Sequence, residues 1–436
     1  MKRVINYAIN YKMAMNVKKI FGKIFVFSIA ILASCTDPEY VEVEVDPNVI
    51  SPSAPGDVVG KVVVGYQGWF GAAGDGSPFN TWRHWAVSGV PAPNNQSFEL
   101  YPDTREYPKT YQTGYANLGG GDPAKLFSSW DDQTVNVHFK WMKQYGIHTA
   151  ALQRFGNHMA NDPRDRNHKD GMAQKVRTAA EANQVKFFIW YDISGWTDFQ
   201  SAIKTDWLEK MKAYTSSAMY AKQNGKPVVS IWGLGVPNRP GNNASYLDVI
   251  NWFQEQGCYV IIGTARNWCS KTDFLEAYKE ADMVSPWSVG TFRDLAGADK
   301  YKNEVMKEDL AFLTANKKDY LPVVFPGFAW SNWKPGTVKN EIPRLHGDFM
   351  WRQFKNIVDL GMQNSYVAMF DEYDEATAIA KAAENTSQTP TDQYFLTLDA
   401  DGVEVSSDFY LRLTNDAGKL LKRQLPVTDQ HPTAHK

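Results

Sequence analysis

The sequence predicts an α/β fold, a single (β/α)8 TIM barrel with long βα loops. Short apolar runs rich in β-formers recur from residue 58 onward, and amphipathic stretches of roughly 10–20 residues separate most of them. There are eight such runs, and eight strand–helix units fit a closed barrel better than an open sheet. An open doubly wound sheet would more often carry a glycine-rich phosphate turn after its first strand, whereas here strand 1 is followed by QGWFG.

The predicted elements follow one another in a regular order. The strands are expected at residues 61–66, 148–153, 186–191, 227–232, 259–263, 283–286, 321–325 and 366–370. The amphipathic helices between them are expected at residues 132–145, 171–183, 205–222, 300–317 and 344–360. A last helix over residues 408–422 is expected to cover the barrel.

Residues 1–34 have the pattern of an export signal, with Met15 as the expected true start. Lys18, Lys19 and Lys23 precede an apolar run, residues 24–32, that is too short to cross a membrane. The run ends in LASC, which resembles the bacterial lipobox and implies cleavage before Cys35 and lipid attachment to it. That resemblance predicts a cell-envelope lipoprotein of a Gram-negative bacterium, anchored to the outer membrane on its periplasmic or surface face. The alternative is a buried cysteine after a signal peptide.

The rest of the chain divides into three parts. Residues 35–57 are acidic and rich in proline, which is typical of a tether. Residues 58–425 form the predicted barrel domain, and residues 426–436 are expected to be a flexible tail.

Composition excludes several classes of function. The formal charge is −2, so the chain has no excess of basic residues that would favour binding to nucleic acid. The protein is separately expected to be a monomer. The eight histidines show no HExxH spacing, so neither a metal nor a cofactor is expected. Three cysteines cannot form a disulfide scaffold, and whether Cys258 and Cys269 pair is left open.

Aromatic residues gather where the predicted strands end. They make up 14% of the chain, including 15 Trp, and the carboxyl ends of barrel strands are where barrel proteins bind ligands. Sugars pack their CH-rich faces on such rings while their hydroxyls meet polar side chains, so a polysaccharide or oligosaccharide partner is expected. A single Trp is more often a core residue, but the collective placement favours binding. The candidate substrate-binding residues are Tyr66, Trp69, His84, Trp85, Gln153, Arg154, Asp192, Trp232, Trp287, Trp330 and Asp371.

The segment after the eighth strand is the most specific signal. It places Asp371, Glu372, Asp374 and Glu375 within five residues, and crowded like charges raise some carboxyl pKa values. Glycoside hydrolysis needs one protonated and one ionised carboxyl. Glu372 and Glu375 are three residues apart and are therefore the candidate catalytic pair. The alternative interpretation of the charge cluster is a solvated surface.

Two motifs resemble glycoside hydrolase family 99, the endo-α-mannosidases and endo-α-mannanases, and its secreted family 71/99-like relatives. That family ends its barrel with Phe-Asn-Glu-Trp-His-Glu-Gly-Thr, and residues 370–377 here are FDEYDEAT. The family's Tyr-x-x-Trp-Tyr-Gly motif is matched by residues 66–71, YQGWFG, and its His-Trp by His84 and Trp85. The likeness spans about residues 62–377.

The resemblance implies a retaining reaction on an α-linked, mannan-like glycan without a glycosyl-enzyme ester. Glu372 would deprotonate the sugar 2-hydroxyl, which attacks C1, while Glu375 would protonate the leaving oxygen and later activate water. Asp192 stands where the family carries a sugar-contacting glutamate. Asp374 replaces the family's histidine, and Arg154 would suit an acidic or sulfated sugar, or pair with Asp371 or Asp192.

Two other functions are compatible with these residues. One is a non-catalytic glycan-binding lipoprotein on the same barrel, and the other is a family 71-like α-glucanase. The presence of both glutamates favours an enzyme, because a relative that had lost catalysis would be expected to replace at least one of them.

Overall fold

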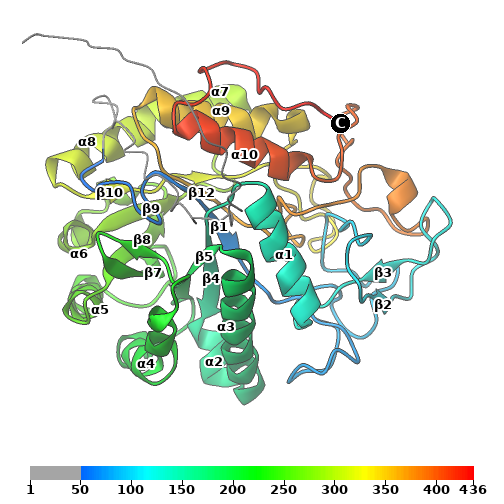
Figure 1. Cartoon of the computed structure of the whole chain (residues 1–436), viewed down its shortest axis with the longest axis horizontal. Helices are drawn as coiled ribbons and strands as arrows, with labels where there is room; N and C mark the ends of the chain where they lie inside the picture. The colour runs from blue at the N-terminus through cyan, green and yellow to red at the C-terminus, as the bar shows by residue number, and fades with distance from the viewer. Residues whose placement is uncertain (1–50) are drawn as a thin grey trace, which may run out of the picture. The chain divides into compact units, whose positions relative to one another are not determined.

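The computed structural model describes residues 51–436 (Figure 1). The predicted signal peptide, Cys35 and residues 36–50 of the predicted tether lie outside the described residues. Within residues 51–436 no helix combines the length and the apolar character needed to cross a bilayer.

The core is a barrel of parallel strands, which confirms the predicted fold class. Its strands in order are β1 (Val62–Tyr66), β4 (Thr149–Phe155), β5 (Lys186–Asp192), β7 (Lys226–Leu234), β8 (Tyr259–Ala265), β9 (Met283–Trp287), the pair of short pieces β10 (Asp319–Tyr320) and β11 (Val323–Val324), and β12 (Ser365–Val367). Each predicted strand run coincides with one of these eight positions. β12 pairs in parallel with β1, so the sheet returns to its first strand. The strands are buried on both faces, as their near-continuous apolar sequences require.

The seventh strand is interrupted. β10 pairs with β9 and β11 pairs with β12, and Leu321 and Pro322 lie between the two pieces. The Leu321 N–H donates to the Val284 carbonyl at 2.9 Å, and the Tyr366 N–H donates to the Pro322 carbonyl at 2.9 Å. Because proline has no N–H, the ladder cannot run unbroken through this position.

Helices surround the barrel (Figure 1). They are α1 (Asp132–Gln144), α2 (Gly156–Asn161), α3 (Pro163–Asn183), α4 (Phe199–Asp206), α5 (Asn243–Glu255), α6 (Leu275–Glu280), α7 (Leu295–Tyr301), α8 (Lys307–Ala315), α9 (Asp348–Asp359) and α10 (Phe409–Leu421). The local sequence determines where several helices begin. The Asp162 side chain accepts from the Arg164 N–H at the start of α3, where Pro163 is the first helical residue. Asn242 and Ser245 form a reciprocal capping box at α5.

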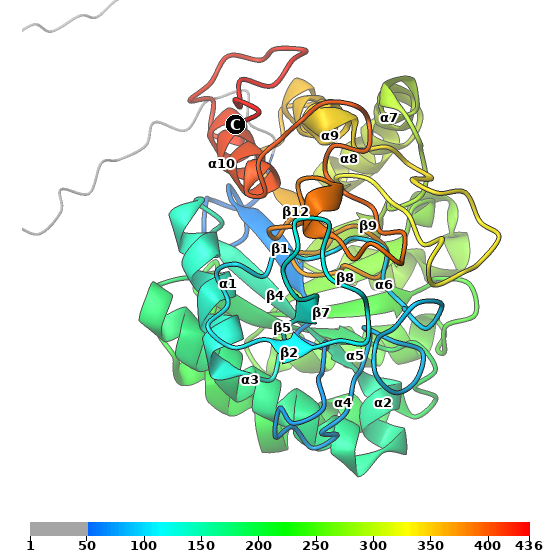
Figure 2. The ribbon, with the colours of Figure 1, turned by 90° about the vertical axis from the view of Figure 1, so that its right-hand side faces the viewer.

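Long loops cover the carboxyl end of the barrel. Residues 67–131, which contain the hairpin β2 (Tyr111–Gln112) and β3 (Lys125–Leu126), lie beside residues 370–405 (Figure 2). The Glu99 N–H donates to the Tyr373 carbonyl at 3.0 Å, and Leu100 forms a bridge with Leu396. These contacts join the loop after strand 1 to the loop after strand 8 and so build one rim.

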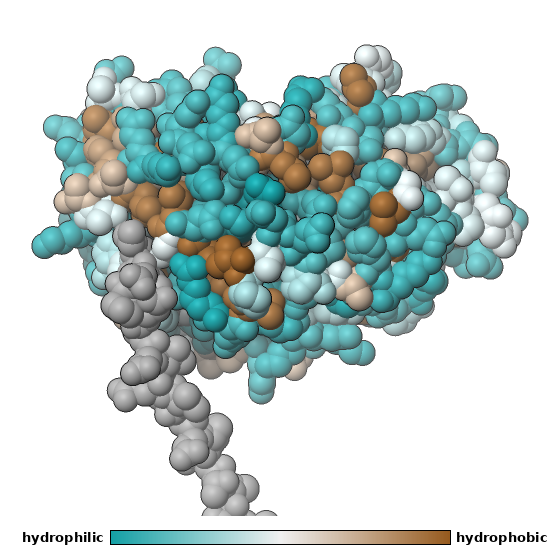
Figure 3. Space-filling view, turned by 90° about the horizontal axis from the view of Figure 1, so that it is seen from above, coloured by the Kyte–Doolittle hydropathy of each residue, from teal (hydrophilic) through white to brown (hydrophobic). Residues whose placement is uncertain are grey.

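The two ends of the described chain pack on the domain. Ser51 donates to the Asp319 carboxylate at 2.6 Å, so the last residues of the predicted tether contact the barrel. Residues 426–436 lie against α9 and α10, where their carbonyls accept hydrogen bonds from the Trp351 indole N–H at 3.0 Å and from Arg412. The surface seen from above is mostly hydrophilic, with apolar residues in separate small groups (Figure 3).

Candidate active site

Glu372 and Glu375 lie on a tight turn that follows β12. The chain turns back on itself so that the Ala378 N–H donates to the Glu372 carbonyl at 3.0 Å. Ala376 has a left-handed backbone with φ 52°, which is uncommon for a residue other than glycine and reverses the chain direction. The Thr377 hydroxyl donates to Glu372 Oε2 at 3.0 Å. The turn therefore holds both glutamates at the carboxyl end of the barrel.

Two adjoining cavities meet at this turn. The first, which we call the barrel cavity, has a volume of about 180 Å³ and is lined by Gln67, Trp69, Gln153, Phe155, Trp190, Asp192, Trp232, Trp287, Tyr366, Met369, Glu372 and Glu375. The second, the loop cavity, has a volume of about 360 Å³ and is lined by Trp69, His84, Ala86, Val87, Ser97, Trp333, Glu372, Asp374 and Glu375. The two cavities share Trp69, Glu372 and Glu375, so the two glutamates lie where the cavities join.

Burial dominates the electrostatics of the two glutamates. It raises the pKa of Glu372 well above its ordinary value, and the charges of Glu375 and Asp374 raise it further. Burial, followed by the charge of Asp374, raises the pKa of Glu375 to about 7. The role of acid expected for Glu375 requires a raised pKa for Glu375 alone, whereas the pKa values of both glutamates are raised because both carboxyls are desolvated and lie near other carboxylates. Two such groups titrate as a pair, and together they retain a proton at neutral pH.

Asp374 contacts the histidine of the strand-1 loop. His84 Nδ1 lies 3.0 Å from Asp374 Oδ2, and the His84 ring stacks on Trp69 with centroids 4.0 Å apart. Burial lowers the pKa of His84 to about 3, so the imidazole is neutral at physiological pH. The pair fixes the orientation of His84 and Trp69 beside the glutamates.

Asp371 has a positioning role and lines neither cavity, contrary to its prediction as a substrate-binding residue. Its carboxylate accepts from the N–H groups of Gln67 at 2.8 Å and Gly68 at 2.9 Å. Gly68 has φ 60°, so the turn after β1 adopts a backbone that favours glycine. Burial raises the pKa of Asp371 to about 6, against the effect of these two backbone donors. Asp371 thereby ties the loop after strand 1 to the turn that carries Glu372 and Glu375.

Six of the predicted substrate-binding residues line the cavities, namely Trp69, His84, Gln153, Asp192, Trp232 and Trp287. Besides Asp371, four predicted residues line neither cavity, namely Tyr66, Trp85, Arg154 and Trp330. Tyr66 lies beneath the site, fully buried, with its hydroxyl 3.0 Å from His138 Nδ1.

Trp85 is a core residue. Its ring is fully buried and stacks on Phe70 with centroids 3.9 Å apart, and its indole N–H donates to the Phe127 carbonyl at 2.9 Å. Trp85 lines neither cavity, although it follows the cavity residue His84 directly, because the backbone bends at His84, where φ is 61°.

Arg154 points out of the barrel and is not a rim residue. It pairs with Asp206 of α4, with Nε 2.8 Å from Oδ2, and with Asp170 of α3, with Nη2 2.7 Å from Oδ1. Its neighbour Gln153 points into the barrel and donates to the Tyr366 hydroxyl at 2.9 Å. Successive residues of a strand face opposite sides, so Gln153 and Arg154 cannot both line the site. The expected pairing of Arg154 with Asp371 or Asp192 is also replaced by these two partners.

Trp330 lines neither cavity. Lys334 Nζ lies 3.5 Å from the centroid of the Trp330 ring and 5.2 Å from that of Trp333. Trp333, 45% exposed, lines the loop cavity instead. The Glu99 carboxylate holds this loop by accepting from Ser331 at 2.6 Å and from the Asn332 N–H at 2.7 Å.

Several cavity residues were absent from the predicted site: Gln67, Phe155, Trp190, Trp333, Tyr366 and Asp374. The signal that finds most of them is the two-residue period of a strand, which places Trp190 and Asp192 on the inner side of β5 and Tyr191 on the outer side. Among residues 51–436 no cluster of His, Cys, Asp and Glu side chains is arranged to hold a metal ion.

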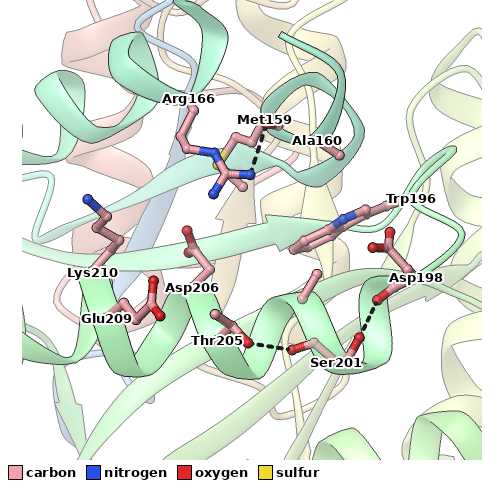
Figure 4. Close-up of a pocket in the computed structure, with 11 residues that line it drawn as sticks. Met159, Ala160, Arg166, Trp196, Asp198, Ser201, Thr205, Asp206, Glu209 and Lys210 are labelled. Atoms are coloured by element: carbon pink, nitrogen blue, oxygen red, sulfur yellow. Dashed lines mark hydrogen bonds between the residues drawn. The ribbon is translucent and has the colours of Figure 1, made fainter. Parts of the chain in front are cut away.

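A separate cleft of about 360 Å³ lies outside the barrel, between α2, α3 and α4 (Figure 4). It is lined mainly by polar residues, including Arg166, Asp198, Asp206 and Lys210. Asp206 is already paired with Arg154, and the Arg166 guanidinium donates to the Met159 carbonyl at 3.2 Å. The cleft shares no residue with the barrel and loop cavities.

The fold is that of barrel-shaped glycoside hydrolases. A structure of the GH99 endo-alpha-mannosidase from Bacteroides thetaiotaomicron is similar to this chain over 84% of this chain and 100% of that one, with a TM-score of 0.63 and 14% sequence identity. The same enzyme in complex with bis-tris-propane gives a TM-score of 0.62, also with 14% identity, over 84% and 98% of the two chains. A glycoside hydrolase-like protein matches 78% of this chain and 99% of its own, with a TM-score of 0.51 and 14% identity. No protein-family model and no curated protein sequence matches the chain.

Proposed function

We propose that the protein is a glycoside hydrolase that cleaves an α-linked, mannan-like polysaccharide or glycan. The observation that carries the proposal is the position of Glu372 and Glu375 at the junction of two aromatic-lined cavities. A glycan that occupies both cavities would place a glycosidic bond beside the two carboxyls. Cavities on both sides of the pair favour endo-action, because sugar units can then extend in both directions from the cleaved bond.

The two carboxyls titrate as a pair, and a pair that shares one proton offers one acid and one base. The proposed roles require this proton to rest on Glu375 in the substrate complex. In the proposed retaining reaction, Glu372 takes the proton of the sugar 2-hydroxyl, whose oxygen attacks C1 while Glu375 gives its proton to the leaving oxygen. Water, deprotonated by Glu375, then opens the 1,2-anhydrosugar at C1, and the 2-oxygen regains a proton from Glu372.

The aromatic side chains are proposed to be the sugar platforms. Trp232 and Trp287 lie edge to face in the barrel cavity, with ring centroids 6.3 Å apart, and Trp333 is exposed in the loop cavity. Exposed indole faces bind the apolar faces of sugars, and nearby polar groups such as Gln153 and Asp192 would bind the hydroxyls. The glycoside hydrolase-like structural neighbours support the same class of activity.

Location and partners complete the proposal. The lipobox-like sequence at Cys35 supports an outer-membrane lipoprotein that meets polysaccharide at the cell envelope. The protein is proposed to act there as a monomer. No cofactor enters the proposed reaction, since the acid, the base and the nucleophile all come from the two glutamates and the substrate.

The test is hydrolysis of a polysaccharide panel by the whole chain in detergent. α-Mannans and α-glucans are incubated with the wild type and with a Glu372→Gln, Glu375→Gln double variant, and new reducing ends are measured. We expect α-mannan cleavage by the wild type alone, with the anomeric configuration retained in NMR spectra. Cleavage restricted to α-glucan would indicate a family 71-like glucanase. Binding without cleavage would indicate a non-catalytic glycan-binding protein and would overturn the proposal.

A further inference from the structure

A cation that the proposed reaction does not use lies beside the barrel cavity. The Arg239 guanidinium carbon is 5.2 Å from the ring centroid of Trp232, a residue that lines this cavity. Arg239 follows β7 and is partly buried. Its distance from Trp232 is within the range of a cation–π contact, so the guanidinium is held beside the sugar-binding ring.

The local backbone is built to hold Arg239 in this place. β7 carries a register shift between Trp232 and Leu234, and Gly233 within it has φ 113°. The chain then turns tightly, with the Val236 N–H donating to the Gly233 carbonyl at 3.2 Å. A Cβ on Gly233 would lie 2.8 Å from the Ile193 side chain and 3.6 Å from Arg239 Cγ, so a side chain there would disturb the arrangement. Bulges of this kind re-aim side chains next to binding sites.

The Arg239 side chain has no hydrogen-bonded partner among residues 51–436. It forms no ion pair and its side chain makes no hydrogen bond in this part of the chain, and its Nε is buried without a partner. Asp192, on the same cavity, accepts from the Ser194 N–H at 2.7 Å and makes no close ion pair with Arg239. Burial raises the pKa of Asp192, and the charge of Arg239 opposes this rise, so the guanidinium lies near this carboxyl without contacting it. Arg154, by contrast, is buried with two carboxylates. A buried donor without a partner is costly, and a ligand that supplies an acceptor removes the cost.

Other unused donors surround the same cavity. The indole N–H groups of Trp232 and Trp69 are also buried without partners among the described residues. The barrel cavity thus combines an aromatic wall with polar N–H donors that have no partner in the described part of the protein, while the acidic residues are concentrated at the junction between the two cavities.

We propose that the substrate is an acidic α-glycan and that Arg239 binds a carboxylate or sulfate group on the sugar in the barrel cavity. The proposal rests on the proposed glycoside hydrolase function and names the substrate class of that site. A guanidinium presents paired N–H donors in a planar fork that matches carboxylate and sulfate oxygens, and such charge-assisted bonds are about twice as strong as neutral ones. A neutral sugar can satisfy the donors with hydroxyls but offers no negative charge to Arg239.

The experiment compares charged and neutral versions of the same polysaccharide. The whole chain in detergent, carrying Glu375→Gln to prevent turnover, is titrated calorimetrically with α-mannan and its chemically sulfated derivative, and with α-polygalacturonate and its carboxyl-reduced derivative. We expect the anionic member of one pair to bind about tenfold more tightly than its neutral counterpart, and the preference to shrink between about 50 and 500 mM salt. The pair that shows the preference identifies the group as sulfate or carboxylate.

Variants isolate the role of Arg239. Arg239→Gln should abolish the preference by weakening binding of the anionic member about tenfold more than binding of the neutral member, and Arg239→Lys should retain part of the preference. Arg177→Gln, on α3 where Arg177 pairs with Glu181, changes the net charge equally and should leave the preference intact. Thermal melting checks that all variants are folded.

Two results would overturn the acidic-substrate proposal without overturning the proposed glycoside hydrolase function. One is equal binding of both members of each pair, and the other is an undiminished preference in Arg239→Gln. Cleavage of a neutral glycan by the wild type together with either result refutes the acidic-substrate proposal alone. If the wild type neither binds nor cleaves any polysaccharide, both proposals fail.

Discussion

Replacing Glu375 by glutamine should remove the proposed acid while preserving the shape of the site. With its pKa raised to about 7, Glu375 can hold a proton at neutral pH. General acid–base catalysis contributes about 10²–10⁴-fold to a rate, or about 3–5 kcal/mol. We therefore expect kcat/KM for an unactivated α-glycan to fall by this factor in Glu375→Gln.

The leaving group separates the roles of the two glutamates. An aryl leaving group departs without protonation, so Glu375→Gln should lose much less activity on an aryl glycoside than on the natural linkage in the first step. Glu372→Gln should be slow on both, since no other residue is proposed to deprotonate the 2-hydroxyl. For the same reason, a substrate without a 2-hydroxyl should not react. The assay is steady-state kcat/KM for both variants on one matched pair of substrates.

The pH profile gives a second measurement of the same assignment. Above pH 7 the proton on Glu375 is lost, so kcat/KM of the wild type should fall about tenfold per pH unit. The negative charge of Asp374 helps to raise this pKa, so Asp374→Asn should lower it and move the alkaline limb to lower pH. Asparagine keeps a polar partner for His84.

Three outcomes would refute this reasoning. They are equal rescue of both glutamine variants by the aryl leaving group, near-normal activity in either variant, and an alkaline limb that persists unchanged in Glu375→Gln.

Three further predictions concern stability, binding and the anchor. Trp85→Ala should lower the free energy of unfolding by about 3–5 kcal/mol in guanidinium titrations, because Trp85 is a buried core residue. Trp333→Ala should change the free energy of unfolding by less than about 0.5 kcal/mol and should weaken glycan binding, because Trp333 is exposed. The reverse pattern would contradict the assignment of Trp85 to the core and of Trp333 to glycan binding. Arg154→Gln should cost about 3–5 kcal/mol by the same measurement, because two carboxylates lose their cation, and a variant as stable as the wild type would exclude a structural role. Cys35→Ala should abolish labelling by a clickable fatty acid, and labelling that persists would remove the lipoprotein claim.

The strands could be predicted from the sequence because a barrel strand is buried on both faces and therefore appears as a continuous apolar run. That same property hides which side of the strand a polar residue occupies. Gln153 and Arg154 both follow such a run, and only the register decides that Gln153 faces Tyr366 and Arg154 faces the helices. Counting by two from one known inward residue would have separated them.

The loops were harder to predict for a different reason. The contact between His84 and Asp374 joins residues 290 positions apart, and no local pattern encodes it. Arg239 was missed because its position depends on the bulge at Gly233, which resembles any other glycine in the sequence. Trp330 was predicted to bind the substrate, but Trp333, three residues later, lines the loop cavity, and this difference could be found only from the three-dimensional packing.

The break between β10 and β11 gives the barrel a seam. β10 and β11 each pair through only two residues, whereas β7 and β8 pair through six. Amide hydrogen exchange should therefore be fastest along the wall between Tyr320 and Val324, because fewer ladder bonds must open there. The neighbouring strand β12 leads directly into the turn that carries Glu372 and Glu375. Local opening of the sheet at this seam would therefore displace the two glutamates while breaking few hydrogen bonds elsewhere.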